Sequence, residues 1–319
     1  MIKEKEEDSL DLMVRVSWLY YKEDLTQKKV GEQLNISRQK VQRLLDKARD
    51  MGIVQISINH PDVNLLNLEK ALIKKHNLDD AVVVPSAKNQ DGLLQSLGHA
   101  SASFIERYLD KHDIRSIGIG WGQTMRAFAD NYDSNDSERE IEIVSLVGHL
   151  LQNTAVNPYN IARTISEKMS CECYDLWAPA IIESEERTKV FRSEPWIKMT
   201  LQKAEEADLY IYSVGQISLE ATLYQLDFLS STEIQSLREQ GAVGDILTQF
   251  FTSEGEILKT ELQKRVIAMP IETLREEDNT TVCIAGGQPK VSAINGALEG
   301  NFIDILIVDE TAANSLLGK

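Results

Sequence analysis

The chain has 319 residues, a formal net charge of −16 at pH 7 and only three cysteines. This length allows a small domain plus a full α/β domain. No stretch of about twenty apolar residues occurs, and the first residues lack the apolar core of a signal peptide. We therefore expect a soluble, cytoplasmic protein that contacts no membrane. The cysteines and the five histidines have no metal-ligand or disulfide spacing, so we expect no metal, no cofactor and no catalytic thiol.

The acidic charge is unevenly distributed along the chain. Residues 1–58 carry 11 basic and 10 acidic side chains, and within them residues 26–49 carry 7 basic and 2 acidic ones. Residues 59–319 carry 23 basic and 40 acidic side chains. A cationic segment attached to an acidic body suits a protein that touches DNA at one end only, because the body repels phosphate elsewhere.

The first expected elements are three helices. A helix over residues 9–22 precedes residues 26–45, whose apolar positions recur at helical spacing and predict two short helices. Thr26 and Ser37 stand at the N-cap positions of these two helices. Asn35 lies between them and tolerates the left-handed turn that joins a helix-turn-helix pair.

Cations occupy the first turn of both short helices, where they oppose the helix macrodipole by roughly 0.3–1 kcal/mol each when exposed. A bound polyanion reverses this penalty, so the pattern favours DNA binding over the alternative, a solvated helix hairpin with a basic surface. Lysines are expected to hold phosphates, and arginine and glutamine to read base edges. The residues expected to contact double-stranded operator DNA are Lys28, Lys29, Ser37, Arg38, Gln39, Lys40, Gln42 and Arg43.

Residues 53–78 connect this segment to the rest of the chain. Gly52 is a natural helix stop, and residues 53–58 alternate as a half-buried strand does, which predicts a wing. We expect a helix-turn-helix DNA-binding domain over 1–58 and an effector-binding and oligomerisation domain over 59–319. Within the second domain, 59–78 would form a linker helix that also dimerises.

From about residue 79, short β-branched runs alternate with amphipathic segments. Such a pattern indicates an α/β, Rossmann-like domain with a mostly parallel sheet covered on both faces. The expected strands are 81–85, 116–120, 141–147, 208–215, 281–287 and 303–309. The expected helices are 91–110, 123–130, 158–169, 195–206, 231–239, 289–299 and 310–317.

Ligands of open α/β sheets lie at the carboxyl ends of strands, so the following turns are candidate sites. The sequence SIGIGWGQTM (116–125) runs from a strand into Gly120 and Gly122 before a helix opens with Gln123 and Thr124. Backbone N–H groups at such a helix start bind anions, although a tight turn without a ligand has the same appearance. The motif matches neither a Walker sequence nor a complete dinucleotide fingerprint.

Three further places complete the candidate ligand site. VCIAGGQPK (282–290) ends a strand with Gly286 and places Lys290 in the first turn of the next helix, as an anion partner or a solvated lysine. In GAVGDIL (241–247), Asp245 would need partners if buried, either sugar hydroxyls or the backbone. Gly148 offers another close backbone approach. A phosphate cradle, a lysine and a carboxylate together suit a phosphorylated sugar.

In this order and spacing, four segments resemble the SorC (SorC/DeoR-type) family of sugar-binding transcriptional regulators over essentially the whole chain. The resemblance rests on LTQKKVGEQLNISRQKVQRLLDKARDMGIVQI, IGIGWGQTM, GAVGDILTQFF and VCIAGGQPKVSAI. It implies an effector domain similar to sugar-phosphate isomerases of the glucosamine-6-phosphate deaminase type, a homo-oligomer (dimer or tetramer), and a repressor controlled by a phosphorylated sugar. The implied effector contacts are Gly120, Gly122, Gln123, Thr124, Gly148, Asp245, Gly286 and Lys290.

At one place the chain departs from the family pattern. Where relatives often have a basic residue followed by two glycines, this chain has Val147, Gly148 and His149. The departure removes support for a second phosphate contact or a lysine-linked aldehyde adduct. One rival hypothesis is an isomerase or deaminase with an appended DNA-binding domain, for which Asp245 and His149 are the candidate general bases. Another is a ligand-free architectural DNA binder.

Overall fold

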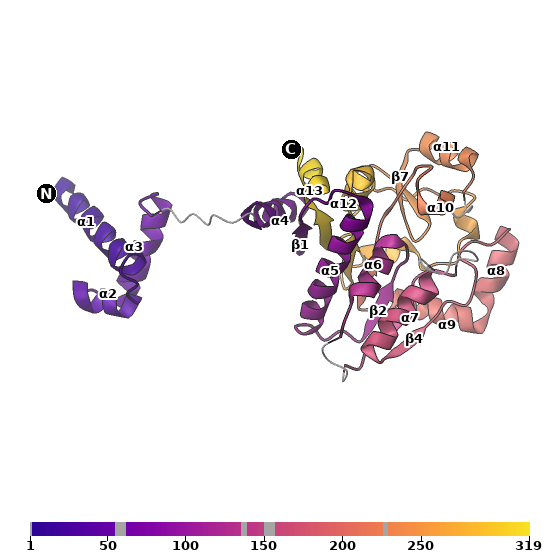
Figure 1. The fold of residues 1–319 in the computed structure, drawn as a ribbon, viewed down its shortest axis with the longest axis horizontal. Coiled ribbons are helices and arrows are strands. Elements are labelled where there is room, and N and C mark those ends of the chain that lie inside the picture. The colour runs from indigo at the N-terminus through magenta and orange to yellow at the C-terminus, as the bar shows by residue number, and fades with distance from the viewer. Residues whose placement is uncertain (1, 55–61, 135–138, 150–156, 226–228) are drawn as a thin grey trace. The chain divides into compact units, whose positions relative to one another are not determined.

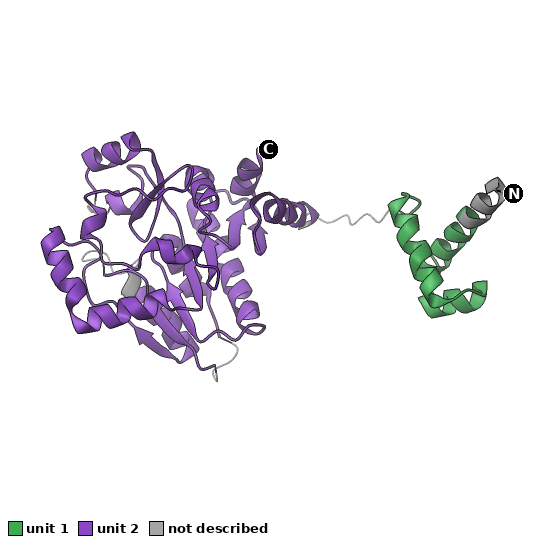
Figure 2. Cartoon of the chain, turned by 180° about the vertical axis from the view of Figure 1, so that it is seen from behind, with its two compact units in different colours: residues 1–60 green, residues 61–319 purple. Residues whose placement is uncertain are grey.

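A computed structural model describes residues 2–54, 62–134, 139–149, 157–225 and 229–319. The chain divides into two compact units, residues 1–60 and 61–319, each with its own apolar core (Figures 1 and 2). The boundary expected after residue 58 and residues 55–58 of the expected wing strand lie outside the described residues. None of the described helices is both long enough and apolar enough to span a bilayer.

In the smaller unit, the described residues form three helices, α1 (Ile2–Tyr21), α2 (Gln27–Leu34) and α3 (Arg38–Asp50). Its core comes from apolar side chains on all three helices, namely Val16, Leu19, Val30, Val41 and Leu45. The expected helix pair of the motif is therefore present, and the preceding helix packs against it.

Local backbone chemistry fixes the turn between α2 and α3. Asn35 has φ 55° and ψ 41°, the left-handed conformation expected at the joint. A Cβ on Gly31 would stand 2.7 Å from the carbonyl oxygen of Ile36, so only glycine permits this close crossing. The hydroxyl groups of Thr26 and Ser37 accept hydrogen bonds from the backbone N–H groups of Lys29 and Lys40, as N-cap residues do at the start of a helix.

The larger unit is built on a seven-stranded, all-parallel sheet in the order β1-β10-β9-β5-β2-β3-β4. The strands are β1 (Asp80–Val84), β2 (Ser116–Ile119), β3 (Glu142–Ser145), β4 (Glu172–Tyr174), β5 (Leu209–Tyr212), β9 (Thr280–Ile284) and β10 (Ile305–Asp309). All six strands expected from the sequence occur; β1 is shifted by one residue from the expected 81–85, and the other five are shorter than expected. β4 was not expected, because three residues at the sheet edge, one exposed and two half-buried, give no clear pattern.

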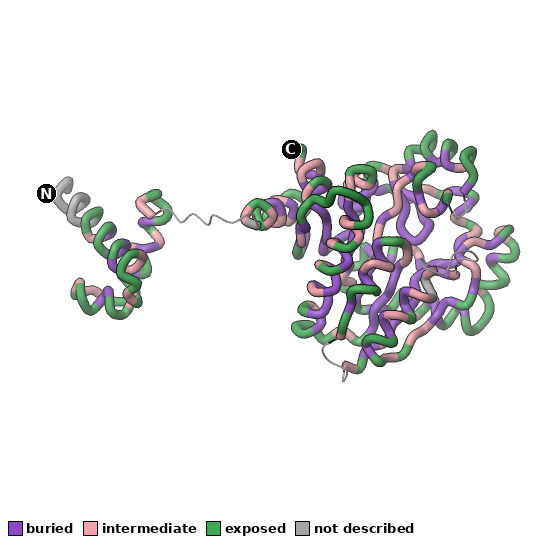
Figure 3. Tube along the Cα trace, in the orientation of Figure 1, coloured by how far each residue is buried: buried purple, intermediate pink, exposed green. Residues whose placement is uncertain are grey.

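Helices cover both faces of the sheet, as near-continuous apolar strands require (Figures 1 and 3). One face is covered by α5 (Gln90–Leu109), α6 (Gln123–Asn131) and α7 (Pro158–Met169). The other is covered by α4 (Asp62–His76), α9 (Pro195–Glu205), α12 (Val291–Glu299) and α13 (Glu310–Leu317). Two shorter helices, α8 (Glu185–Ser193) and α10 (Thr222–Gln225), were not expected, whereas α11 (Ser231–Glu239) was.

Helix α4, expected as a dimerising linker, is an integral part of the larger unit. It packs against β1 and α13, and its Leu68 and Leu72 are buried in the main core. The Glu69 carboxylate accepts a hydrogen bond from the backbone N–H of Val83 in the edge strand β1. The apolar repeat that suggested a dimer contact is thus used within the chain.

The segment 241–247 is a strand and not a strand-to-helix turn, which corrects the expectation. It forms β7 (Ala242–Ile246) in a small antiparallel sheet with β6 (Gly215–Gln216) and β8 (Gln249–Thr252). A two-residue turn joins β7 to β8, and its residues, Leu247 and Thr248, have φ values of 51° and 64°. Hairpin turns of this kind normally carry Asn and Gly, so this sequence gave no hairpin signal.

Candidate functional site

A cavity of about 480 Å³ lies at the carboxyl ends of three sheet strands in the larger unit. Its walls come from the turns after β2, β5 and β9, from β6 and α10, from the β7–β8 hairpin and from Gln90 at the start of α5. This is the edge at which open α/β sheets bind ligands, and the volume suits a small metabolite. Six of the eight expected effector residues line it, namely Gly122, Gln123, Thr124, Asp245, Gly286 and Lys290.

The turn after β2 presents the start of α6 to this cavity. Gly122 is the N-cap with φ 109° and ψ 177°, a conformation open to glycine alone, and no side chain caps the helix. Thr124, in the first turn, is 4% exposed, so its hydroxyl lies where the cavity meets the helix. Uncapped N–H groups at a helix start carry partial positive charge, which makes this turn a suitable anion site.

The turn after β9 has the same glycine-rich sequence but a different arrangement. The backbone N–H of Gly287 donates to Oδ1 of Asp309 at 2.7 Å, and Oδ2 of Asp309 accepts from the N–H of Thr311 at the start of α13. Asp309 is buried at the end of β10. The anion that this turn holds is therefore a carboxylate of the protein itself, although Gly286 still lines the cavity.

Lys290 and Asp245 bring opposite charges to the cavity wall. Lys290 ends a short 3₁₀ turn (Gln288–Lys290), and its Nζ donates to the Ser213 hydroxyl at 3.3 Å. Burial lowers the pKa of Lys290, whereas the nearby Cys283 and Asp245 act in the opposite direction. Burial raises the pKa of Asp245 to about 6, while the N–H of Thr248 and the charge of Lys290 oppose this rise.

Asp245 fits its place because the facing residue has no side chain. A Cβ on Gly215, its partner across β6 and β7, would stand 2.0 Å from Oδ1 of Asp245. Oδ2 of the same carboxylate accepts from the backbone of Thr248 and holds the hairpin turn. Asp245 is thus both a wall residue and a support of the strained Leu247–Thr248 turn.

Gly120 and Gly148 are not among the described residues that line the cavity, and their assignment as effector contacts stays a prediction. A Cβ on Gly120 would stand 2.9 Å from Cβ of the buried Tyr212, so this glycine makes room for a core side chain. The N–H of Gly148 donates to the carbonyl of Ile267, and a Cβ there would meet the carbonyl of Ala178 at 2.5 Å. Both glycines serve packing.

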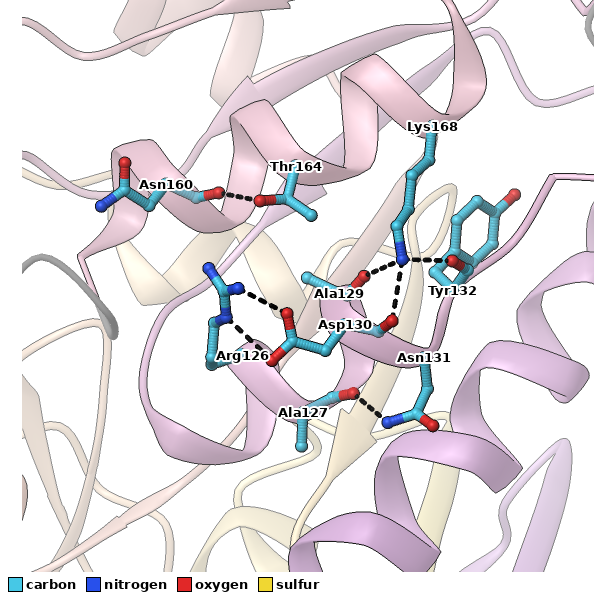
Figure 4. Close-up of polar contacts among 9 residues, drawn as sticks. All are labelled: Arg126, Ala127, Ala129, Asp130, Asn131, Tyr132, Asn160, Thr164 and Lys168. Carbon is cyan, nitrogen blue, oxygen red and sulfur yellow. Dashed lines mark hydrogen bonds and ion pairs between the residues drawn. The ribbon is translucent and has the colours of Figure 1, made fainter.

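The end of α6 remote from the cavity is fixed by α7 (Figure 4). Nζ of Lys168 donates to the carbonyl oxygens of Ala129, Asp130 and Tyr132 at 3.0, 2.8 and 2.7 Å. These carbonyls belong to the last turn of α6 and the residue that follows it, so one lysine satisfies three acceptors and complements the negative end of the helix. These contacts join the last turn of α6 to α7.

Several wall residues were not expected from the sequence. Trp121 lies inside the motif SIGIGWGQTM, directly before Gly122. The sequence did not mark it as a wall residue, but the structure places it, half-buried, in the cavity wall. The others come mainly from the segment after β5, whose sequence has no recognisable signature. They include Ser213, Gln216, Glu220, Thr222 and Gln225.

In the smaller unit, all eight expected DNA contacts are exposed. Neither α2 nor α3 has an acidic residue in its first turn, so the cations there are not neutralised locally. Gln39 and Arg43 lie one turn apart on the face of α3 opposite the buried Val41 and Leu45.

Gln42 differs from the expectation of a base-reading residue. Its Oε1 accepts from Gln27 of α2, and its Nε2 donates to both carboxylate oxygens of Asp46 at 3.2 Å. The structure thus uses both ends of this amide to join α2 to α3. The prediction that Gln42 reads base edges therefore requires that it give up these contacts on DNA.

Comparison with known proteins agrees with both units. A family model described as "Putative sugar-binding domain" matches residues 60–318, and one described as "Sigma-70, region 4" matches residues 18–50. The erythritol catabolism regulatory protein EryD of Brucella abortus (strain 2308) is 31% identical over 313 residues, which cover 98% of each chain. The deoxyribonucleoside regulator of Bacillus subtilis (strain 168) is 31% identical over 312 residues, which cover 96% of this chain and 97% of that one.

A solved structure has the same fold. The full-length sorbitol operon regulator SorC from Klebsiella pneumoniae matches with a TM-score of 0.76 and 26% identity, covering 97% of this chain and 99% of that one. The relatives are named as regulators and not as enzymes, which supports a transcriptional regulator over an isomerase with a DNA-binding domain. The expected likeness to glucosamine-6-phosphate deaminases stays a prediction. With a helix-turn-helix unit and a sugar-binding α/β domain, the chain belongs to the SorC family of sugar-binding transcriptional regulators.

Proposed function

We propose that the chain is a repressor that binds operator DNA through α3 and releases it when a monophosphorylated sugar, or a related metabolite, occupies the cavity. The observation that carries this proposal is the convergence of the uncapped start of α6, Lys290 and Asp245 on one cavity. Helix N–H groups and a lysine suit a phosphate, and a buried carboxylate suits sugar hydroxyls.

The charges around the cavity favour one phosphate over two. Among the described residues that line it, Lys290 is the only cation, and Asp245 and Glu220 are acidic. The second glycine turn already holds Asp309, so it offers no second phosphate site. The remaining polar wall consists of amides and hydroxyls, which recognise hydroxyl groups. They are Gln90, Gln123, Thr124, Ser213, Gln216, Thr222 and Gln225.

Names of relatives suggest which sugars to test first. They refer to erythritol, deoxyribonucleosides and sorbitol. A panel for this chain therefore contains the monophosphates of erythritol, deoxyribose and sorbitol, each with its unphosphorylated form, and one sugar bisphosphate. We expect a monophosphate to raise the melting temperature most, because only it satisfies the anion site without adding a second charge.

The first experiment measures ligand binding by thermal shift and by titration calorimetry. Lys290→Gln should weaken binding of the preferred monophosphate by about 10–150-fold, since a charge-assisted hydrogen bond contributes roughly 1.5–3 kcal/mol. Lys198→Gln, an exposed lysine of α9 that does not line the cavity, is the matched control and should bind as the wild type does. Equal binding by both variants would contradict the phosphate assignment.

The second experiment measures operator binding with and without that ligand. Ligand shifts the equilibrium only as far as it prefers one quaternary state, and for a repressor it must prefer the state with weak DNA affinity. Arg43→Ala should relax sequence preference by roughly 1–3 kcal/mol at one base pair, whereas Lys28→Ala should weaken all sites alike and lower the salt dependence by about one ion. Tighter operator binding with ligand would contradict the release of DNA by the ligand.

A further inference from the structure

The turn after β9 has one side on the cavity and the other side on helix α13. Three of its residues line the cavity, namely Gly286, Pro289 and Lys290. Between them, the N–H of Gly287 donates to Asp309, which is the N-cap of α13. Oε1 of Gln288 accepts from the hydroxyl of Ser315, in the second half of α13, at 3.0 Å. Because both sets of contacts lie within one short turn, a displacement of Lys290 also displaces the residues that hold α13.

The other end of α13 is fixed to α4. Nζ of Lys75, in the last turn of α4, donates to the carbonyl oxygen of Leu316 at 2.6 Å. That carbonyl lies in the last turn of α13, so the ammonium group complements the negative end of this helix. Leu316 is buried in the same core as Leu68 and Leu72 of α4, and the two helices pack against each other (Figure 1).

Helix α13 is therefore in contact with both the cavity turn and α4. Among the described elements, it alone packs substantially against both α4 and the 3₁₀ turn Gln288–Lys290. Helix α4 also packs against β1, but β1 is paired along its whole length with β10 and is held in the sheet. A helix of 8 residues can shift by about 1–2 Å against its neighbours, as packed helices do in switching proteins.

We propose that α13 transmits occupation of the cavity to α4, the helix that follows the DNA-binding unit along the chain, through the hydrogen bonds that Ser315 and Lys75 donate. This inference rests on the proposed function, since it names the route by which a ligand of that cavity acts. The hydrogen bond from Nζ of Lys290 to Ser213 is long, at 3.3 Å. A phosphate group is a stronger partner for this lysine, so the turn moves toward the ligand and pulls on α13.

Hydrogen exchange of the full-length chain tests the route without a ligand. Lys75→Met removes the bond from α4 to α13, so the amides of residues 286–290 should exchange about two- to fivefold faster relative to those of α7. Lys74→Met is the matched control, because Lys74 is exposed in the same turn of α4 and forms no side-chain bond among the described residues. Equal relative exchange at 286–290 in the two variants would overturn the proposal.

A binding measurement tests the consequence for the ligand. It compares operator affinity, on a duplex obtained by in-vitro selection, with and without the monophosphates of erythritol, deoxyribose and sorbitol. Ser315→Ala should bind operator and monophosphate separately as the wild type does. The factor by which the ligand weakens operator binding should fall from the usual range of about 5–150-fold to below about threefold. Asn314→Ala, which loses a hydrogen bond to Glu310 within α13, is the matched control and should keep the wild-type factor.

The double variant Ser315→Ala, Lys75→Met tests whether the two bonds belong to one route. If they do, it should lose no more of this factor than the more affected single variant. An unchanged factor in Ser315→Ala, or losses that add in the double variant, would contradict a route through α13. A wild type that binds none of the three monophosphates would instead contradict the proposed function, whereas the exchange experiment would still decide whether α13 joins the turn to α4.

Discussion

Two glycine-rich turns, 120–124 and 286–290, reach the same cavity with similar sequences and different chemistry. Each follows a parallel strand and opens a helical turn, and each has a glycine at positive φ, 109° at Gly122 and 88° at Gly287. At the first turn no side chain caps the helix that follows. At the second, the N–H of Gly287 already donates to Asp309.

The difference shows that a glycine-rich turn becomes a ligand site only where its donors have no partner in the protein. For the turn after β9 this partner is Asp309, which lies 22 positions after Gly287 at the end of the neighbouring strand β10. The turn after β9 holds an anion that is part of the chain, and under the proposed function the turn after β2 holds the phosphate of the ligand. Each of the following changes tests one side of this comparison.

The largest effect is expected at the turn that holds its own carboxylate. Asp309→Ala leaves the N–H of Gly287 and the first turn of α13 without an acceptor, which should lower the free energy of unfolding by about 2–4 kcal/mol. Urea denaturation measures this loss. Millimolar inorganic phosphate should then stabilise the variant more than the wild type, because the emptied turn accepts an external anion.

Glu310→Ala provides the control, since it removes a neighbouring carboxylate in the first turn of the same helix without touching Gly287. Glu310→Ala should lower the free energy of unfolding by less than about 1 kcal/mol. If Asp309→Ala is as stable as this control, or gains nothing from phosphate, the two turns do not differ in the way described here.

Asp245, which also lines the cavity, should make the free energy of unfolding depend on pH, by an amount similar to the loss expected for Asp309→Ala. Its pKa is raised by burial to about 6, against 3.8 for an ordinary aspartate, so the folded chain binds this proton more tightly than the unfolded chain does. Protonated Asp245 therefore adds its full contribution to the free energy of unfolding below about pH 4, and this contribution is lost as the pH rises through 6. The total is on the order of 3 kcal/mol.

Asp245→Asn is neutral throughout and should flatten the fall in unfolding free energy between pH 4 and 6. Glu220→Gln, which removes the other carboxylate that lines the cavity, is the comparison variant and should keep the wild-type slope. A slope unchanged by Asp245→Asn would show that another group produces it.

Gly122→Ala probes the turn that holds no carboxylate of its own. Nothing lies within 4 Å of the added Cβ, so the expected loss of about 1–3 kcal/mol comes from the φ of 109° alone. Relief of that strain would move the start of α6, so the preferred monophosphate should also bind more weakly. Gly318→Ala, with φ 76° and open space at the end of α13, should lose stability without any change in ligand binding.

Sequence patterns predicted the elements whose signals are local. The helix pair over 26–45 followed from caps, a left-handed asparagine and helical spacing, all within twenty residues, and the parallel strands followed from β-branched runs. The β6–β8 sheet was missed because its tight turn is made by Leu247 and Thr248, which hold left-handed conformations only through surrounding structure.

The sequence predicted those parts of the cavity wall that contain glycine-rich turns or charged residues. It did not predict the remaining wall residues. The contact of Gly120 with Tyr212 was not predicted, because the same small residue can make room for a ligand or for a bulky neighbour. The contacts of Gln42 with Gln27 and Asp46 were not predicted either, because they are identified only by side-chain geometry. In each case, the deciding neighbour is fixed by tertiary packing and not by spacing along the chain.

The smallest effect is expected at the far end of α6, where Lys168 binds three carbonyl groups (Figure 4). Lys168→Met removes an exposed cation at a helix C-terminus, so we expect a loss of about 1 kcal/mol and ligand binding weakened by less than threefold. Arg126→Met is the matched control, because its ion pair with Asp130 lies within α6 and does not reach α7. It should lose only about 0.3–0.5 kcal/mol and keep wild-type affinity. Weaker ligand binding in Lys168→Met alone would show that α7 positions the open turn, whereas equal affinities would leave that turn determined by Gly122 and the end of β2.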